Sequence, residues 1–343
     1  MEPAGVCSGY RSSAPNKRLT SPIIKSIALQ SPSASEISNM KLTEHRALIF
    51  DVYGTLVDWE SAIHDALVPV FPDFSREKIL VSYAGVEGIL QTQFQGTPYS
   101  KILELAYRQL STASSGVTMA GVAEGELRKE QPAPTSDVKE ESAPPSPSDD
   151  AKRFGRSIPD WKPFPDTIDA LHRLKKHFAL VVLSNVDDRS FSGTHEKLCS
   201  PDYPGSAYRT ITPDSPFSLV LTAQQVGAYK PDPLMLESAL KQLSANPDPS
   251  LPSNPSVRVD ASEVLVVANS ICHDVIPAMQ HNLHSVWISR HGVNSIGSDS
   301  NVAARYSDKE GATAEDGEYP CTWRYETLGR MADAVEEEVE KEV

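Results

Sequence analysis

The stretch LIFDVYGTLVDW, residues 48–59, runs from three large apolar residues directly into a single acid, Asp51. An apolar run that does not alternate with polar residues is typical of a strand covered on both faces. Gly54 permits a sharp turn after it, and the Thr55 hydroxyl can donate a hydrogen bond to a carboxylate. We therefore predict a buried strand that ends at Asp51, with Tyr53 two positions later.

Four more short apolar runs have the same character, and helical patterns separate them. The predicted strands are residues 47–50, 180–183, 219–221, 264–268 and 286–288, and the predicted helices between the later strands are 165–177, 233–243 and 274–281. Alternation of strands and helices indicates an α/β fold. We predict a Rossmann-like, doubly wound parallel sheet.

The first two strands are separated by about 130 residues, far more than a crossover helix needs. Apolar residues from Ala62 to Leu110 recur at helical spacing. We therefore predict an inserted α-helical cap domain over 59–161, with the core formed by 45–58 and 162–330.

Several segments are too polar or too rich in Pro and Ser to bury much apolar surface. Within the cap, residues 111–157 are predicted to form a disordered loop. Residues 1–44 are predicted to be a disordered tail, and low-complexity loops are expected near 199–216 and 245–257. The acidic end, 331–343, is predicted to be a tail in the form of a solvated helix.

The composition excludes several classes of partner. A net charge of −14 argues against nucleic acid and anionic membranes, and no apolar run reaches the roughly 18 residues of a membrane span. Four cysteines without CxxC spacing indicate a reduced, metal-free chain. We expect a cytoplasmic protein with a small-molecule substrate, and a homodimer stays open. A mitochondrial transit peptide in the mildly basic N-terminal segment is the alternative, as is a start at Met40.

Polar residues follow the predicted strands at the points where these strands end. They are Asp51, Ser184, Asn185, Lys230, Ser270 and Asp274. In open α/β sheets, ligands bind at the carboxyl ends of the strands. We therefore expect these side chains to meet in one crevice.

The chemistry of this set is coherent. A carboxylate such as Asp51 can act as a nucleophile and divide a hydrolysis into formation and breakdown of an ester. Lys230 would keep that carboxylate ionised and offset developing negative charge. Asp274 could orient a water, hold a cation, pair with Lys230, or simply cap its helix.

The motifs DVYGT, LSN, YKPDP and NSICHD resemble the four motifs of the haloacid dehalogenase superfamily, and the similarity is greatest to its type II branch. The resemblance implies that Asp51 is the nucleophile. It also implies supporting roles for Thr55, Ser184 and Lys230. Asn185 would help to hold the leaving halide. Asp274 would prepare the hydrolytic water, or help Asp51 to hold Mg²⁺ if the protein is a phosphatase.

Tyr53 distinguishes between these two activities. In the phosphatases of the superfamily that this chain resembles, the position two residues after the nucleophile is an acid, which protonates a leaving alkoxide. A halide is a stable anion and needs no such proton. We therefore expect carbon–halide hydrolysis of a small organic acid without a required cofactor. A magnesium-dependent phosphatase is the alternative.

Three positions depart from the dehalogenase pattern. The cap helix around 75–94 has no arginine beyond Arg76 at its start, and Leu236 and Ile271 replace an expected aromatic residue and an expected asparagine. These departures motivate a third hypothesis, a catalytically weak binding protein of the same fold.

The side chains predicted to bind substrate are Tyr53, Asn185, Ser270 and Trp59. Some candidates also have plain structural roles: Ser184 and Asn185 can cap helices, and Trp59 can pack the cap against the core. Tyr83 and Tyr99 either line the cleft or pack inside the cap. His273 is expected to pack rather than to carry protons.

Overall fold

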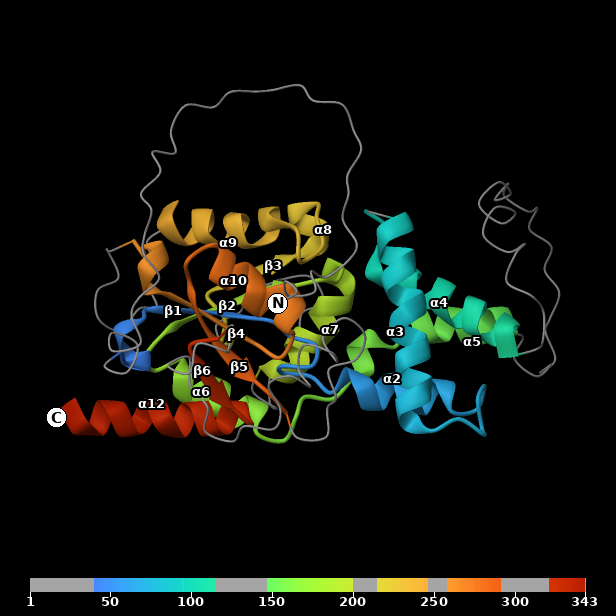
Figure 1. The fold of residues 1–343 in the computed structure, drawn as a ribbon, viewed down its shortest axis with the longest axis horizontal. Helices are drawn as coiled ribbons and strands as arrows, with labels where there is room; N and C mark the ends of the chain where they lie inside the picture. The colour runs from blue at the N-terminus through green and yellow to red at the C-terminus, as the bar shows by residue number, and fades with distance from the viewer. Residues whose placement is uncertain are drawn as a thin grey trace, which may run out of the picture.

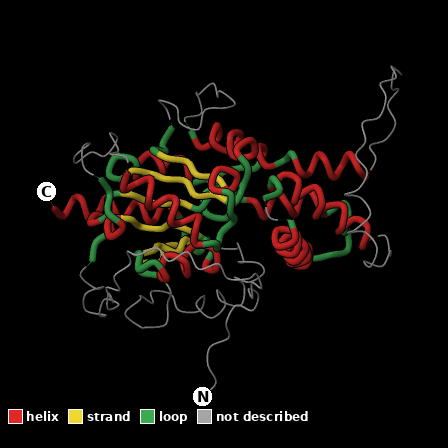
Figure 2. Tube along the Cα trace, turned by 90° about the horizontal axis from the view of Figure 1, so that it is seen from above, coloured by secondary structure: helices red, strands yellow, loops and turns green. Residues whose placement is uncertain are grey.

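The computed structural model describes residues 40–94, 96–114, 147–199, 215–245, 258–290 and 321–342. In this part of the chain an α/β core lies beside a smaller group of helices, the cap (Figure 1). The view from above shows the same separation, with the strands in the core and only helices in the cap (Figure 2).

The core contains a parallel sheet with the strand order β3-β2-β1-β4-β5-β6. The strands are β1 Ala47–Phe50, β2 Ala179–Ser184, β3 Leu219–Thr222, β4 Val264–Ala268, β5 His284–Ile288 and β6 Trp323–Tyr325. The five predicted strands are confirmed. The sixth, β6, was not predicted, because its three residues are all partly exposed and form no apolar run.

Helices cover both faces of the sheet, as predicted for a doubly wound fold (Figure 1). Along β1, Ala47 and Ile49 pack into one apolar cluster, whereas Leu48 and Phe50 pack into the other. The helices of the core are α6 Thr167–Leu174, α7 Asp188–Leu198, α8 Ala223–Val226, α9 Pro233–Ala245, α10 Ile276–Gln280 and α12 Leu328–Glu342. The strand β1 is therefore buried on both sides, and it lies inside the sheet between β2 and β4.

The structure corrects the sequence prediction near both ends of the chain. The predicted tail at 331–343 is part of α12, which buries Leu328, Met331 and Val335 at helical spacing against α6. At the other end, Leu42 is fully buried, although it falls within the predicted disordered tail. Residues 1–39, 200–214 and 246–257, which cover most of that tail and most of the two low-complexity loops, lie outside the described residues.

The cap is built from α2 Trp59–Leu67, α3 Arg76–Gln93, α4 Tyr99–Ser114 and α5 Pro147–Gly155. Helix α5 falls in the segment predicted to be disordered, so this part of the prediction is wrong. Ala151 and Phe154 are buried in the cap, and acids in the first turn and bases in the last turn suit the helix dipole. Residues 115–146 of that segment lie outside the described residues.

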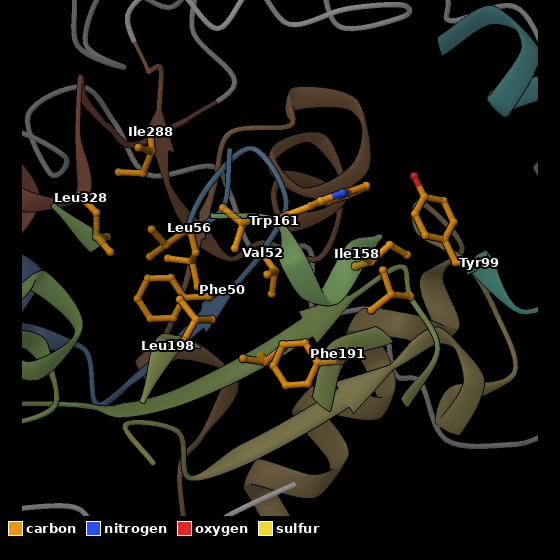
Figure 3. Close-up of a cluster of buried hydrophobic side chains, with 14 of the residues drawn as sticks. Phe50, Val52, Leu56, Tyr99, Ile158, Trp161, Phe191, Leu198, Ile288 and Leu328 are labelled. Carbon is orange, nitrogen blue, oxygen red and sulfur yellow. The ribbon is translucent and has the colours of Figure 1, made fainter. Parts of the chain in front are cut away.

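The two connections between core and cap run side by side. Val57 forms bridges to both Tyr53 and Pro163, and the Asp58 N–H donates to the Lys162 carbonyl at 2.9 Å. A single apolar cluster extends from Phe50 in the core to cap residues such as Tyr99 (Figure 3). The cap is therefore packed onto the core next to the turn that follows β1.

None of the described helices is long and apolar enough to cross a bilayer.

Two histidines, His45 and His284, lie together at the amino-terminal ends of the strands, far from the turn that follows β1. His45 Nδ1 donates to the Leu42 carbonyl at 3.1 Å, so its Nε2 must accept the proton of His284 Nδ1 at 2.9 Å. Burial lowers the pKa of His45 and of His284 below the usual 6.5, which favours two neutral rings.

We expect this pair to make stability depend on pH. A lowered pKa means that the unfolded chain binds protons more readily, so stability falls as the pH decreases below about 6.5. The melting temperature should fall between pH 7 and pH 5.5. His284→Gln keeps a donor for His45 but removes one titrating ring, and should therefore show a smaller fall. An equal pH dependence in both proteins would contradict this origin.

Candidate active site

Three strand ends and loops bring a lysine between two carboxylates. Asp51 follows β1, Asp274 lies in the π-helical turn η4 Ile271–Val275 after β4, and Lys230 lies between α8 and α9. Nζ of Lys230 donates to Asp51 Oδ1 at 2.8 Å and to Asp274 Oδ1 at 2.7 Å. The predicted crevice therefore has a buried, ion-paired centre.

The charge state of Lys230 follows from these contacts. The residue is only 4% exposed, and burial by itself would lower its pKa. The charges and hydrogen bonds of Asp274 and Asp51 together outweigh burial, and the pKa of Lys230 is raised. The side chain is thus a permanent ammonium that compensates the two acids.

Thr55 holds the other oxygen of Asp51. Its Oγ1 donates to Asp51 Oδ2 at 2.8 Å and accepts the Asn269 N–H at 2.8 Å. The turn between them needs Gly54, whose φ of 96° lies in the left-handed region. A Cβ at Gly54 would also lie 3.1 Å from Nε1 of Trp59. Both oxygens of Asp51 are therefore fixed by hydrogen bonds.

The prediction placed the Asn185 amide at the leaving halide, whereas in the structure this amide bonds the backbone of Lys230. Its Oδ1 accepts the Lys230 N–H at 2.6 Å, and its Nδ2 donates to the Lys230 carbonyl at 3.2 Å. This pair of bonds holds the backbone from which the Lys230 side chain extends. Asn185 thus positions the ammonium, and one Nδ2 hydrogen remains for a ligand.

The two serines have unequal surroundings. Ser184, at the end of β2, is fully buried, and its hydroxyl has no hydrogen-bond partner among the described residues. Ser270 caps η4 by accepting the His273 N–H at 3.2 Å. Ser270 therefore has the structural role, whereas Ser184 keeps a polar atom available beside β1.

Tyr53 directs its hydroxyl toward α7. Its Oη forms a 2.9 Å hydrogen bond with Thr194 Oγ1, and its ring packs edge-on against Trp161 at 5.5 Å between centroids. Burial strongly raises the pKa of this phenol. Tyr53 thus fills the position two residues after Asp51 without offering a proton there.

Trp59, the first residue of α2, lies between core and cap. Its indole is next to Gly54, and its ring centroid is 6.0 Å from that of Tyr83. Trp59 therefore borders the turn that bears Asp51.

Two further residues at strand ends were missed. Asn269 directly follows β4, donates its N–H to Thr55, and bonds the Ile288 carbonyl through Nδ2 at 2.8 Å. Arg290, two residues after β5, donates from Nε and Nη2 to the Thr55 carbonyl at 3.1 and 2.6 Å. Their position after buried strands is the same signal that identified Asp51, and it could have identified them.

Replacing Arg290 should disturb the turn that bears Asp51. The guanidinium also bonds Asp166 Oδ1 and stacks on Phe164 at 4.1 Å. Arg290→Met leaves the Thr55 carbonyl and Oδ1 of Asp166 without this donor, and should lower the free energy of unfolding by about 2–4 kcal/mol. Arg290→Lys should lose less in a denaturant titration. Equal stability of Arg290→Met and the wild type would contradict this role.

Asp51 and Asp274 are the residues that would hold Mg²⁺. The ion commonly uses one or two carboxylates together with waters, so this pair fits it. Each acid, however, gives one oxygen to Lys230, so an ion would share the carboxylates with an ammonium. Within the described residues, no group of three His, Cys, Asp or Glu side chains could hold a metal.

The family model of haloacid dehalogenase-like hydrolases matches residues 45–267. No curated protein matches the sequence significantly.

Solved structures of the same fold have 14–15% identity to this chain in the three examples that follow. One is L-2-haloacid dehalogenase from Xanthobacter autotrophicus, 15% identical, with a TM-score of 0.51 over 85% of this chain and 98% of that one. The defluorinating L-2-haloacid dehalogenase Rha0230 is 14% identical, with a TM-score of 0.53 over 86% and 98%. The third is the magnesium-bound HAD-hydrolase YfnB from Bacillus subtilis, 15% identical, with a TM-score of 0.51 over 85% and 99%.

Proposed function

The chain belongs to the haloacid dehalogenase-like hydrolases, and from this membership we propose that it acts through a covalent ester on Asp51. The substrate we propose is a small organic acid that bears a halide on carbon. The observation that supports this most directly is the pairing of Asp51 with Lys230 and Thr55, which fixes a carboxylate group at the end of a buried strand.

In the first step an oxygen of Asp51 attacks the carbon that bears the halide. A C–O bond forms, the C–X bond breaks, and the halide leaves with its electron pair. Two hydrogen bonds hold Asp51 in one orientation, which favours in-line attack. The free Nδ2 hydrogen of Asn185 and the Ser184 hydroxyl are the donors that could receive the halide.

In the second step water attacks the carbonyl carbon of the Asp51 ester. Asp274 accepts a proton from this water, and Lys230 stabilises the negative charge on the tetrahedral intermediate. The C–O bond between Asp51 and the former halide carbon stays intact while the acyl C–O bond breaks. Asp274 returns this proton to the leaving alkoxide, the second proton of the water passes to solvent, and the hydroxy acid departs with an oxygen from Asp51. The water oxygen remains in the Asp51 carboxylate.

Tyr53 supports a leaving group that departs without a proton. Its hydroxyl bonds Thr194, and its pKa is raised by burial, so it is a poor acid for an alkoxide. A halide has no such requirement. An L-2-haloacid dehalogenase from Xanthobacter autotrophicus with the same fold was solved with chloropropionic acid covalently bound, and we propose the same class of chemistry here.

The second candidate is a magnesium-dependent phosphatase. The two carboxylates of Asp51 and Asp274 favour it, and YfnB, a HAD-hydrolase of similar fold, binds magnesium. When bound, the ion would supply positive charge to a phosphoryl group. Asp51 would then attack phosphorus, and the leaving alkoxide would need a proton that Tyr53 is poorly placed to give.

A panel of L-2-haloacids and phosphate esters, each with and without Mg²⁺, tests the assignment. We expect chloride or bromide release from at least one haloacid, independent of Mg²⁺. Phosphate release that requires Mg²⁺, without halide release, would replace the first candidate by the second. Absence of either product would favour a binding protein of this fold.

A further inference from the structure

The start of helix α4 is joined to the core by two hydrogen bonds, in addition to the two chain connections between cap and core. The Ser100 N–H, in the first turn of α4, donates to Oδ2 of Asp187 at 3.1 Å. The hydroxyl of Tyr229 donates to the carbonyl of Thr97, which lies just before α4. Each bond joins a backbone group of the cap to a side chain of the core. The cap segment 97–100 is therefore docked on two different loops of the core.

The carboxylate of Asp187 serves a helix of the core and a helix of the cap. It caps α7, which lies on the side of the core that faces the cap (Figure 1): Oδ1 accepts the Ser190 N–H and Oδ2 accepts the Ser190 hydroxyl, both at 2.9 Å. The Ser100 N–H, which Oδ2 also accepts, is one of the amides at a helix start that have no partner within their own helix. Asp187 is only 5% exposed. Its position therefore depends on contacts with both domains.

The two core loops that receive the cap are the loops that hold Lys230. Tyr229 directly precedes Lys230, and Asp187 lies two residues after Asn185. Asn185 in turn accepts the Lys230 N–H at 2.6 Å and donates to the Lys230 carbonyl at 3.2 Å. Each of three segments is thus joined to the other two in a closed contact ring. These segments are 97–100, 185–187 and 229–230.

The contact ring includes the backbone of the residue whose charge the proposed reaction uses. From this backbone the Lys230 side chain extends to Asp51 and Asp274, with Nζ at 2.8 and 2.7 Å from their oxygens. A shift of the 229–230 segment would therefore move the ammonium relative to both acids. A misplacement of about 1 Å near a reacting group can cost about 100-fold in rate.

We propose that Asp187 and Tyr229 are positioning residues, which place the Lys230 ammonium by docking the start of α4 onto the two loops that hold it. This inference rests on the proposed function and assigns two further residues to it. Both side chains act through the backbone on either side of the Asn185–Lys230 pair. Docking of the cap and placement of the ammonium are then one event, so the site is complete only while α4 contacts the core.

The phenol of Tyr229 keeps its role as a donor at neutral pH. Burial, followed by the charges of Asp187 and Glu87, raises the pKa of this phenol to about 12. The hydroxyl therefore retains the proton that it donates to the Thr97 carbonyl.

Two substitutions open the contact ring at different points. In Asp187→Asn the new amide oxygen can still accept the Ser190 N–H, and asparagine is as good an N-cap as aspartate. Its NH₂ group, however, meets the Ser100 N–H, so a donor faces a donor and the bond to the cap is lost. Tyr229→Phe keeps the aromatic ring and removes the donor to Thr97.

Asp58→Asn is the matched control for Asp187→Asn. Asp58 caps α2 by accepting the N–H and the hydroxyl of Ser61, as Asp187 does with Ser190 in α7. Among the described residues, no third donor bonds the Asp58 carboxylate. The control therefore changes an equivalent cap without opening the contact ring.

Hydrogen exchange followed by mass spectrometry reports on the Lys230 backbone without any turnover, because the Lys230 N–H is the donor to Asn185. The peptide that contains Lys230 should exchange about 10–100-fold faster in Asp187→Asn, and about 2–10-fold faster in Tyr229→Phe, the factors for one charged and one neutral hydrogen bond. In Asp58→Asn it should exchange as in the wild type. The double variant should fall short of the product of the two factors, because opening one contact already releases the other.

Halide release distinguishes placement of the ammonium from simple attachment of the cap. A misplaced ammonium should lower kcat about tenfold in Asp187→Asn, because Lys230 stabilises charge that develops in the reaction. A loosened cap alone would raise KM and leave kcat unchanged. Asp58→Asn should have the kcat and KM of the wild type.

Three results would overturn the inference: unaltered exchange at Lys230 in both single variants, a double variant equal to their product, or a raised KM at constant kcat. If the wild type releases halide while exchange at Lys230 is unaltered in the variants, the inference fails and the proposed function stands. If the wild type releases no halide from any haloacid, the proposed function fails. Exchange at Lys230 then decides by itself whether Asp187 and Tyr229 hold this residue through the cap.

Discussion

Asp51→Asn should reduce halide release by about 10⁴-fold or more, because an amide cannot form the ester and removal of a nucleophile costs factors of this size. The substitution is nearly isosteric. One orientation of the amide keeps an oxygen toward Lys230, so the loss should appear in the turnover rate rather than in folding. The measurement is halide release, together with a thermal melt of both proteins.

A single turnover in water labelled with heavy oxygen tests whether Asp51 is the carboxylate that forms the ester. In a single turnover of wild-type protein, the label should enter the Asp51 peptide, because the water oxygen remains in the carboxylate. Asp58→Asn is the matched control, since the Asp58 carboxylate caps α2 by accepting the Ser61 N–H at 3.0 Å and the Ser61 hydroxyl at 2.6 Å. An active enzyme with an unlabelled Asp51 would refute the nucleophile.

Lys230→Met should lower the free energy of unfolding by about 3–5 kcal/mol, because it leaves two buried carboxylates without their counter-ion. It should also lower kcat/KM by about 10²–10³, through loss of the charge that faces the developing oxyanion. The free energy comes from a denaturant titration, and kcat/KM from halide release.

The loss of stability in Lys230→Met should be larger at pH 8 than at pH 5. At pH 5 a proton can neutralise one of the two carboxylates in Lys230→Met, which relieves the repulsion between Asp51 and Asp274. Adding Asp274→Asn to Lys230→Met removes one negative charge and should recover part of the stability without recovering the rate. If the double variant is no more stable than Lys230→Met, the two acids do not share the ammonium.

The elements that could be predicted are those with a local signal. The strand β1 is a continuous apolar run that ends on Asp51, and β2 and β4 have the same pattern, so their alignment at one edge followed from the fold class. The strand β6 has no such run, because it pairs only with β5 and stays partly exposed. Helix α5 is polar in composition, and the apolar residues that it buries in the cap are Ala151 and Phe154, too few to give a clear helical pattern.

The candidate site also contains features that could be predicted from the sequence and features that could not. The approach of Asp51, Lys230 and Asp274 could be expected, since each follows a strand or a strand-linked loop. The use of the Asn185 amide on the Lys230 backbone could not, because it depends on the exact juxtaposition of two loops that are 45 residues apart. The same holds for the Tyr53 hydroxyl, whose partner Thr194 lies 141 residues away.

The last helix has a consequence for how the protein can be shortened. The Gly329 N–H donates to Asp166 Oδ2 at 3.0 Å, and the other oxygen of Asp166 accepts Arg290, which in turn bonds the Thr55 carbonyl. Trimming the chain before Leu328 would therefore remove the outermost member of a series of hydrogen bonds that ends at Asp51. The acidic C-terminal segment is not a dispensable appendage, and a truncated protein should lose catalytic rate as well as stability.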